Sequence, residues 1–530
     1  MLSFSLGASV AVALGVYAIY TIFKLFYDEV TSPLSKLPGP KSDHWLLGNR
    51  QQMFKNFDGQ EGRWTKEYGR NLRINGFFGF SHFYTTDTKA IQHILSHSYI
   101  YQKPAQARYS IGRIVGPGVL VVEEDEHKKQ NPAFGPTHLR ALTPLFVEKS
   151  KHLRDIWAAK ATQSGGTAKL NVIPEFSTAT LDIIGQAGFN YDFKSLGNAG
   201  SRERDELHDA FTKVSAIGDP EKTLLGFLRM TFPSTTPSTL RRATMRRIGM
   251  GLLEESKRQA VAGVESRTAR DLLSLLVRAN MDKDIPESQR MSDDDVLAQV
   301  PTFLVAGHET TAASWTVYEL AKNPKIQTCL REELLSLDND TPSMDDLNSL
   351  PYLDCVVRET LRGNAPVPTA YDIIPLGTPY TDRNGIVHDT LEIRKGQWIV
   401  MPILAINRDP GHLGPERWQR TPSISTHIPG VWSQMLTFLG GPRACIGFRF
   451  SIIELKALLF TLVRSLEFEL AVPAGDIGRT ITPIVQLPSV RSDADAGSQL
   501  PVLVKPFVQE LRNTVGSLID SNPFGFVYKP

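Results

Sequence analysis

The chain has 530 residues, 41% of them hydrophobic, which is long enough to bury a large core. Its 58 basic and 56 acidic side chains leave a formal charge of +2. This near balance argues against a nucleic-acid-binding protein, which would carry a large excess of basic residues. Three cysteines lie far apart and form no CxxC pair. This pattern excludes a disulfide framework and favours a reducing compartment.

The first 26 residues are interpreted as a transmembrane anchor. Residues 2–23 contain no charged side chain, and at about 1.5 Å per residue a helix of this length extends roughly 33 Å, enough to cross a bilayer. A cleavable signal peptide is the alternative, but no Lys or Arg precedes the apolar run. The basic residues Lys24, Lys36 and Lys41 follow the run, so the positive-inside rule places the rest of the chain in the cytoplasm.

Residues 27–48 are interpreted as a proline-rich hinge. Pro33, Pro38 and Pro40 resist helix continuation and turn the chain stiffly away from the membrane. The segment 49–507 shows no repeat, low-complexity tract or long flexible linker, so we expect one large domain there. Residues 508–530 would then be a C-terminal extension.

Three helices and a stretch of strands are predicted within this domain. A capping box from Ser292 to Asp295 starts a long helix that Pro301 bends. A second helix is expected at about 352–362, and a third follows Gly447, where apolar residues recur every three or four positions up to residue 466. Short apolar runs with turn residues predict strands at 390–407. The fold class is therefore mainly α with small β-sheets.

The strongest functional signal is a glycine-rich loop that reads FLGGPRACIG, residues 438–447. It brings Cys445 to the start of an amphipathic helix, where free N–H groups and positive potential stabilise a thiolate. Glycines let the backbone pass close to a flat ligand, and Arg443 offers a fixed charge to an anionic group. The alternative is a buried structural cysteine after a turn, which would suit a lone cysteine better than this surrounding pattern.

Two further motifs lie on the predicted helices. In the bent helix an AGHETT run contains Gly307, which costs about 1 kcal/mol of helix propensity, followed by Glu309 and Thr310. Taken alone, Thr310 is better explained by a hydrogen bond to a carbonyl of its own helix. In the second helix Glu359 and Arg362 face each other, an arrangement worth a few tenths of a kcal/mol when it is exposed.

Together these motifs resemble those of the cytochrome P450 family, in particular its membrane-bound fungal members. The haem-binding loop of that family has the residue types of Phe438, Gly441, Arg443, Cys445 and Gly447 at the same offsets. The resemblance implies the cytochrome P450 fold behind the anchor and haem b as the cofactor. It also implies that Cys445 is the axial iron ligand, that Arg443 meets a haem propionate and that Phe438 packs near the thiolate.

The same resemblance assigns roles to the other motifs. Glu309 and Thr310 are expected to supply protons during dioxygen activation. Glu359 and Arg362 are expected to be buried together with Arg417, forming a structural group that supports the haem loop.

The chain departs from the family pattern at several short internal gaps. His127 matches the family's aromatic or histidine position beside the cofactor, but Asn131 stands where an arginine is expected. A second arginine is missing near Tyr371. Two of the three usual propionate-binding arginines are therefore absent, through divergence or a misassigned exon boundary. Because a buried carboxylate without a cation is costly, we expect weak haem binding.

The resemblance implies a monooxygenase that inserts one oxygen atom from dioxygen into a small organic, apolar substrate. Electrons are expected from an NADPH-dependent flavoprotein reductase, because this sequence shows no flavin or dinucleotide fingerprint. With the anchor in membrane lipid, the expected location is the endoplasmic reticulum membrane, with a single span and the catalytic domain on the cytoplasmic side. A haem-thiolate isomerase or dehydratase is disfavoured by Glu309 and Thr310. A haem-binding remnant or misassigned gene product without catalysis is the other alternative.

Overall fold

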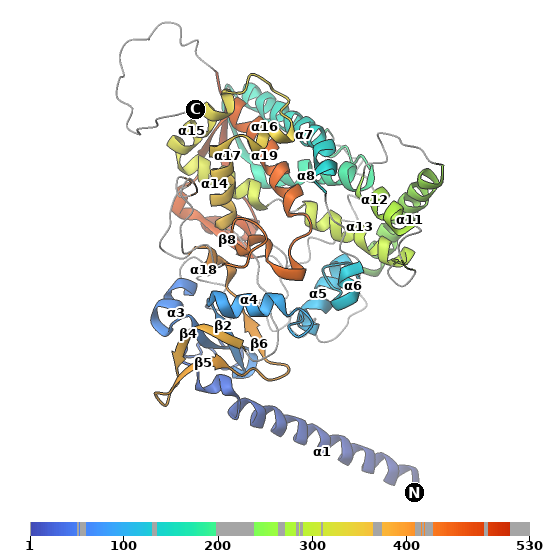
Figure 1. Ribbon diagram of the computed structural model, residues 1–530, viewed down its shortest axis with the longest axis vertical. Coiled ribbons are helices and arrows are strands. Elements are labelled where there is room, and N and C mark those ends of the chain that lie inside the picture. Colours follow the sequence, from blue (N-terminus) through green and yellow to red (C-terminus); the bar gives the residue numbers. More distant parts are fainter. Residues whose placement is uncertain are drawn as a thin grey trace.

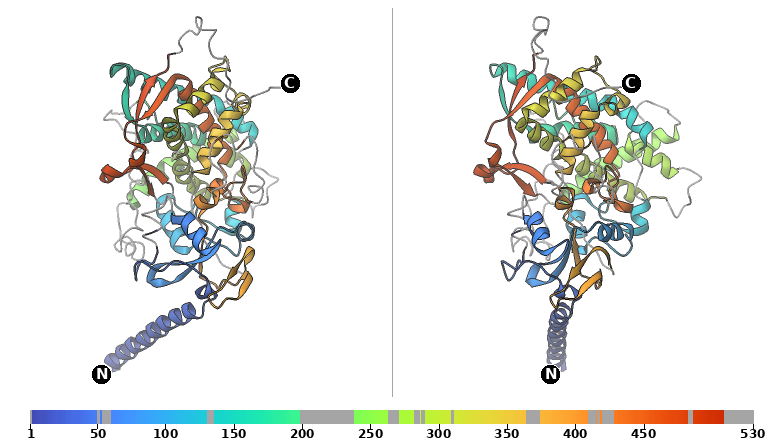
Figure 2. Two further views of the ribbon diagram at one scale, coloured as in Figure 1. Left: turned by 90° about the vertical axis from the view of Figure 1, so that its left-hand side faces the viewer. Right: turned by 60° about the vertical axis from the view of Figure 1, so that its left-hand side comes forward.

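The computed structural model describes residues 2–49, 52, 60–129, 135–197, 238–262, 271–281, 286, 290–308, 311–363, 374–408, 415, 418, 428–481 and 486–508. The helix α1 (Leu2–Val30) projects from the body as a single rod (Figures 1 and 2). Its segment Ala8–Val30 has a mean hydropathy of 1.8 and is not buried against the rest of the chain. An apolar helix that leaves its side chains exposed is compatible with a membrane anchor.

The end of α1 is bonded into the body of the protein. The Glu29 carboxylate accepts a hydrogen bond of 3.0 Å from the Ser81 amide. Just beyond the helix, Arg394 donates to the Thr31 carbonyl oxygen at 2.8 Å. Pro33, the first proline of the predicted hinge, begins the short 3₁₀ helix η1 (Pro33–Lys36), whose Leu34 is fully buried.

The body is mainly helical, as predicted. Its α-helices are α3 (Gln60–Tyr68), α4 (Thr88–Ser96), α5 (Ala105–Val115), α6 (Glu124–Lys129), α7 (Pro136–Gln163), α8 (Val172–Phe189), α11 (Ser238–Val261), α12 (Leu272–Met281), α13 (Asp293–His308), α14 (Thr311–Lys322), α15 (Pro324–Leu335), α16 (Met344–Asn348), α17 (Pro351–Arg362), α18 (Ile403–Asn407) and α19 (Phe448–Ser465). Short 3₁₀ helices are η2 (Phe77–Gly79), η7 (Leu436–Phe438), η8 (Gly441–Arg443), η9 (Ala474–Asp476) and η10 (Arg491–Ala496).

The strands form small sheets. They are β1 (Asn71–Asn75), β2 (Ser81–Thr85), β3 (Ala168–Asn171), β4 (Ile374–Thr381), β5 (Val387–Leu391), β6 (Trp398–Val400), β7 (Leu466–Leu470), β8 (Ile477–Ile481), β9 (Gln486–Val490) and β10 (Pro501–Pro506). Within the described ranges they pair in the orders β1-β2-β6, β3-β10-β7, β4-β5 and β8-β9. The β2–β6 pair is parallel and the other pairs are antiparallel. The sheets of β1, β2, β4, β5 and β6 lie at the end of the body nearest α1 (Figure 1).

The helix that follows the glycine-rich loop forms the centre of the core, which confirms the predicted buried stripe. α19 packs against α7, α15 and α17, and its residues from Ile452 to Val463 are all buried. Phe450 meets Phe146 of α7 edge to face, with ring centroids 4.8 Å apart. The helix ends at Ser465, so Leu466, the last residue of the predicted stripe, begins β7 instead.

The predicted strand region at 390–407 is only partly correct. β5 ends at Leu391 and β6 is a short strand, but Ile403–Asn407 is the helix α18. Pro402 precedes this helix and has no N–H to donate to a neighbouring strand. Ile403, Leu404 and Ile406 are buried in the helical conformation, so tertiary packing decides the outcome here.

The predicted capping box is confirmed at the start of α13. The Asp295 amide donates to Ser292 Oγ at 3.2 Å, and the Ser292 amide donates to the Asp295 carboxylate at 3.0 Å. α13 ends at His308 and α14 begins at Thr311, while residues 309 and 310 lie outside the described residues.

Near its C-terminal end, α13 packs tightly against α8. A Cβ atom on Gly307 would lie 2.5 Å from Cγ1 and 2.8 Å from Cβ of Ile184. Because Ile184 is only 4% exposed, it has little room to move away. The glycine is therefore required for close helix packing at this point.

We expect Gly307→Ala to lower the free energy of unfolding by about 1–3 kcal/mol through overpacking. Combining it with Ile184→Ala should recover part of the loss, so the two changes should be non-additive in a double-mutant cycle measured by urea denaturation. Gly251→Ala is the control, because nothing lies within 4 Å of its Cβ position in α11. A loss for Gly307→Ala no larger than for Gly251→Ala would contradict the packing explanation.

Candidate functional site

The glycine-rich loop is built from two tight turns. These turns are the 3₁₀ helices η7 and η8, and Leu439 and Gly441 take positive φ values of 56° and 67°. A Cβ atom on Gly441 would collide with the carbonyl oxygen of Leu95 at the end of α4. The predicted need for glycine in this loop therefore has a specific cause: the backbone passes directly against a neighbouring helix.

These turns place Cys445 immediately before α19. Its amide donates to the Phe438 carbonyl oxygen at 2.8 Å, and its own carbonyl accepts from Phe448 at 3.4 Å. The helix begins at Phe448, with Gly447 at its N-cap. The Phe438 ring is 9% exposed and packs edge to face on Trp432 at 6.0 Å. Phe438, Cys445 and Gly447 are thus brought together by backbone geometry.

The environment of the Cys445 thiol differs from the sequence-based expectation. A hydrogen bond from the Gly447 amide lowers the thiol pKa, as expected at a helix start, but burial has the larger effect and raises the pKa overall. The side chain is nevertheless exposed in accessible area. A sulfur that is accessible yet closely surrounded by protein lies in a concavity rather than on a convex surface.

Arg443 lies at the centre of a cluster of charged side chains. It donates to the Ser98 carbonyl oxygen at 2.5 Å, also bonds to the Tyr101 carbonyl oxygen, and pairs with the Glu123 carboxylate at 2.5 Å. Lys103 lies 3.8 Å from the same carboxylate. The sequence-based interpretation missed Lys103, which is about 340 residues away along the chain.

Positive charge exceeds negative charge in the interior of this cluster. Burial lowers the pKa of Lys103 to about 8, and Arg443 and Arg108 add to this effect while Glu123 opposes it. Arg443 and Lys103 therefore share one buried carboxylate, and Arg108 is close enough to Lys103 to lower its pKa, whereas the acidic first turn of α6 is exposed to solvent. Such an arrangement stabilises additional negative charge nearby.

His127 faces the same cluster from α6. It is 8% exposed, and burial together with Lys103 and Arg443 lowers its pKa to about 4. The imidazole is therefore neutral near pH 7 and adds no positive charge to the cluster.

The predicted pair on α17 forms a bidentate ion pair. Arg362 donates to the two Glu359 carboxylate oxygens at 2.9 and 2.7 Å, and the Arg362 side chain is 7% exposed. Its third contact is to the Asn407 carbonyl oxygen at 3.2 Å. The predicted third member, Arg417, lies outside the described residues. The neighbouring Trp418 is described, and its indole N–H donates to Glu359 at 3.1 Å.

Asn407 and Thr437 connect this pair to the cysteine loop. The Asn407 side chain accepts from the Leu436 amide at 3.0 Å and donates to Thr437 Oγ1 at 2.9 Å. Thr437 in turn donates to the Leu361 carbonyl oxygen at 2.6 Å. The sequence-based interpretation missed both residues, because Asn407 lay in an expected strand and Thr437 had no motif of its own.

The remaining predicted site residues are only partly described. Glu309 and Thr310 lie outside the described residues. Cys355 on α17 is 6% exposed and lies in the core. No group of three or more His, Cys, Asp or Glu side chains that would suit a metal ion occurs in the described parts of the chain. Cys445 is the one iron ligand that the resemblance implied.

The residues around Cys445 fit a thiolate-bound haem. The sulfur lies in a concavity just before the start of α19. In the cluster at Arg443, two cations, Arg443 and Lys103, share the single carboxylate of Glu123, and this excess of positive charge suits the anionic propionates of a haem. The thiol ligand and the positive charge of the cluster therefore both suit a thiolate-bound haem.

Comparison with known proteins gives a consistent result. The family model described as "Cytochrome P450" matches residues 38–489. "Cytochrome P450 monooxygenase 205" of Postia placenta is 46% identical, with 94% of this chain and 98% of the relative covered. "Cytochrome P450 monooxygenase 128" of the same fungus is 44% identical over 93% and 96%. "Cytochrome P450 monooxygenase claW" of Ampulloclitocybe clavipes is 31% identical over 89% and 93%.

Asn407→Ala should lower the free energy of unfolding by about 1–3 kcal/mol, because it leaves the buried Leu436 N–H without its acceptor. Chemical denaturation of the full chain measures this. Gln92→Ala is the control, since Gln92 is an exposed amide side chain on α4 and its removal should change stability by less than about 0.5 kcal/mol. Equal effects of the two changes would show that Asn407 does not support the loop.

Proposed function

This chain belongs to the cytochrome P450 family, and on that premise we propose that Cys445 is the axial ligand of its haem iron. As a member of the family it is a haem-dependent monooxygenase. A thiolate-ligated haem favours cleavage of the O–O bond, so that one oxygen atom enters an organic substrate and the other leaves as water. The observation that carries the proposal is the placement of Cys445 in a concavity at the start of α19.

Arg443 and Lys103 would hold the two haem propionates. Arg443 is fixed by two backbone carbonyl oxygens, and Lys103 is held by the Leu120 carbonyl oxygen at 2.8 Å. Glu123 lies between them, and His127 would contribute a neutral N–H. This cluster supplies the second cation that the missing arginines leave out of the family pattern. It therefore favours haem retention, in place of the weak binding expected from the sequence.

Glu309 and Thr310 would hold and pass a proton on the opposite side of the site. Support comes from the sequence, in which the two residues follow Gly307 and His308 and precede the first residue of α14. Gly307 lets α13 approach α8 closely. A hydroxyl next to a carboxyl can accept a proton from one side and donate from the other. Glu359, Arg362 and Arg417 would act on the loop's scaffold rather than on the substrate.

The redox partner would be an NADPH-dependent flavoprotein reductase, and the substrate a small, apolar organic molecule. The family implies both, and the sequence shows no flavin or dinucleotide fingerprint of its own. α1 would span the endoplasmic reticulum membrane once, with Lys24, Lys36 and Lys41 keeping the catalytic domain on the cytoplasmic side.

Cys445→Ser should abolish activity and shift the Soret band of the reduced, carbon-monoxide-bound protein away from the position typical of thiolate ligation. The serine hydroxyl does not provide the soft, electron-donating ligand. Cys329→Ser is the control, since Cys329 is also exposed but lies on α15, outside the loop. An unchanged spectrum in Cys445→Ser would move the ligand assignment to another residue.

Thr310→Ala should leave haem content unchanged but lower the product formed per NADPH consumed by about tenfold or more, because proton delivery is lost while electron uptake continues. Thr328→Ala, at an exposed position on α15, is the control and should keep the wild-type ratio. If the ratio in Thr310→Ala equals that of the control, Thr310 has no part in proton transfer.

Lys103→Met should speed the transfer of haem to an excess of an acceptor apoprotein by about tenfold, because one propionate loses its cation. Lys103→Arg keeps the charge and should stay closer to the wild-type rate. Lys89→Met is the control, since the Lys89 ammonium also donates to a backbone carbonyl oxygen, at 3.4 Å, but away from Arg443. Equal rates for Lys103→Met and Lys89→Met would exclude Lys103 from propionate binding.

A further inference from the structure

The helix α17, which carries the ion pair behind the cysteine loop, receives a carboxylate at its N-terminal end. The two oxygens of Glu333 on α15 accept hydrogen bonds from the Tyr352 and Leu353 amides, both at 2.7 Å. These amides belong to the first turn of α17, where N–H groups have no partner within a helix. Negative charge suits this end, because the helix dipole is positive there. Glu333 therefore fixes the start of α17 from a neighbouring helix.

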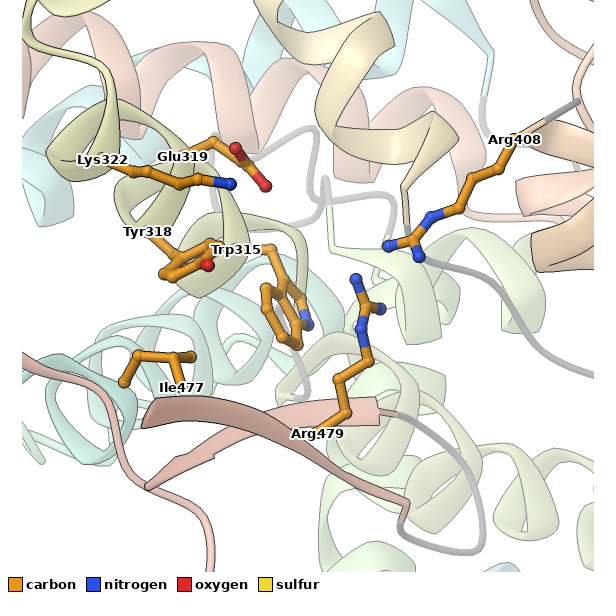
Figure 3. Close-up of a pocket in the computed structure, with 7 residues that line it drawn as sticks. All are labelled: Trp315, Tyr318, Glu319, Lys322, Arg408, Ile477 and Arg479. Carbon is orange, nitrogen blue, oxygen red and sulfur yellow. The ribbon is translucent and has the colours of Figure 1, made fainter. Parts of the chain in front are cut away.

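Two arginines meet the opposite end of α17. Arg408 donates to the carbonyl oxygen of Gly363, the C-cap residue, at 2.9 Å, and Arg479 donates to the same oxygen at 3.3 Å. Figure 3 shows the ends of the two side chains pointing toward each other. Positive charge suits a helix C-terminus, where the dipole is negative. Both ends of α17 are thus held by charged groups from other parts of the chain.

A buried ion pair joins the side of α17 to α19. The Lys456 ammonium on α19 lies 2.9 Å from the Asp354 carboxylate on α17, and it donates to the Asn348 side-chain oxygen at 3.1 Å. The Lys456 side chain is 3% exposed. Arg358 donates to the other Asp354 oxygen at 2.5 Å. Burial alone would raise the pKa of the Asp354 carboxyl, but Lys456 and Arg358 outweigh it and hold that pKa below its usual value.

α17 and α19 are therefore joined at two places. α19 begins at Phe448, three residues after Cys445, and Lys456 lies roughly 12 Å further along it. At the other place, Arg362 near the end of α17 bonds to Asn407, whose side chain bonds to the cysteine loop. Apolar packing between helices is non-directional. The polar contacts therefore determine how far α19 can slide or rotate on α17.

We propose that Lys456 is a positioning residue for the haem thiolate, because its pair with Asp354 fixes the register of α19 on α17 and so holds Cys445 in place. This inference rests on the proposed ligation of the iron by Cys445. Lys456 acts through α19 rather than on the reacting atoms. Breaking the pair leaves a buried charge without its partner, and the start of α19 can then shift. A displaced thiolate donates less electron density to the iron.

The experiment compares Lys456→Met with Lys505→Met in the full-length, haem-loaded protein in detergent. Lys505 is the matched control, since it pairs with Glu469 at 2.6 Å on the more exposed strands β10 and β7. Two properties are measured: the midpoint potential of the haem iron, and the rate at which the reduced, carbon-monoxide-bound protein loses its thiolate-type Soret band on mild warming. Lys456→Met should have a more positive potential and lose the band about tenfold faster. Lys505→Met should match the wild type in both.

Asp354→Asn tests the same pair with a smaller change. It keeps the shape of the side chain but removes its charge, so both properties should change in the same direction by less than in Lys456→Met. The double variant of Asp354→Asn and Lys456→Met should be no worse than Lys456→Met alone, because both changes break one pair. If Lys456→Met retains no haem, Asp354→Asn decides the question by the same two measurements.

The outcomes separate this inference from the ligand assignment. A haem-loaded wild type without the thiolate-type Soret band would refute the ligation by Cys445, and the positioning role with it. A wild type that shows the band, together with Lys456→Met and Asp354→Asn variants that match Lys505→Met in potential and rate, would overturn the positioning role alone. Additive effects in the double variant would overturn it as well, since the two residues would then act independently.

Discussion

The partly buried ion pair between Glu359 and Arg362 is the interaction on which the geometry of the site depends. A buried pair is stabilising only when its remaining donors and acceptors are satisfied. Here Trp418 donates to Glu359, and Arg362 donates to the backbone of Asn407. The Asn407 side chain then bonds directly to the loop that carries Cys445. Through this chain of contacts, α17 helps to position the loop that carries the Cys445 sulfur, independently of a bound cofactor.

Local patterns in the sequence predicted the elements that local physics controls. The Ser292–Asp295 capping box, α17 and the buried face of α19 follow from side-chain chemistry and helical spacing, and each is present as predicted. The helix α18 was not predicted, because its apolar residues fit a strand equally well until Pro402 and tertiary burial decide between the two. Asn407 and Thr437 were missed for a related reason, since their partners lie 29 to 76 residues away.

The electrostatics of the site also depend on residues that are distant in the sequence, so they were predicted only in part. The helix start led us to expect a stabilised thiolate at Cys445, and the Gly447 amide acts in that direction, but burial dominates and raises the thiol pKa. Counting arginines in the family pattern led us to expect weak haem binding. Lys103 comes from a distant part of the sequence to lie beside Glu123 and Arg443, and only the fold reveals that it adds to the positive charge there.

The cysteine loop, the positive cluster and the supporting ion pair together describe a site for one haem held by one thiolate. The most direct measurement is the haem content of the purified full-length chain, determined as pyridine haemochromogen against protein by amino-acid analysis after gel filtration. We expect one haem per chain, retained through the column. A chain that elutes folded, with native helical circular dichroism, but retains much less than one haem would show that Lys103 and Arg443 do not replace the missing arginines.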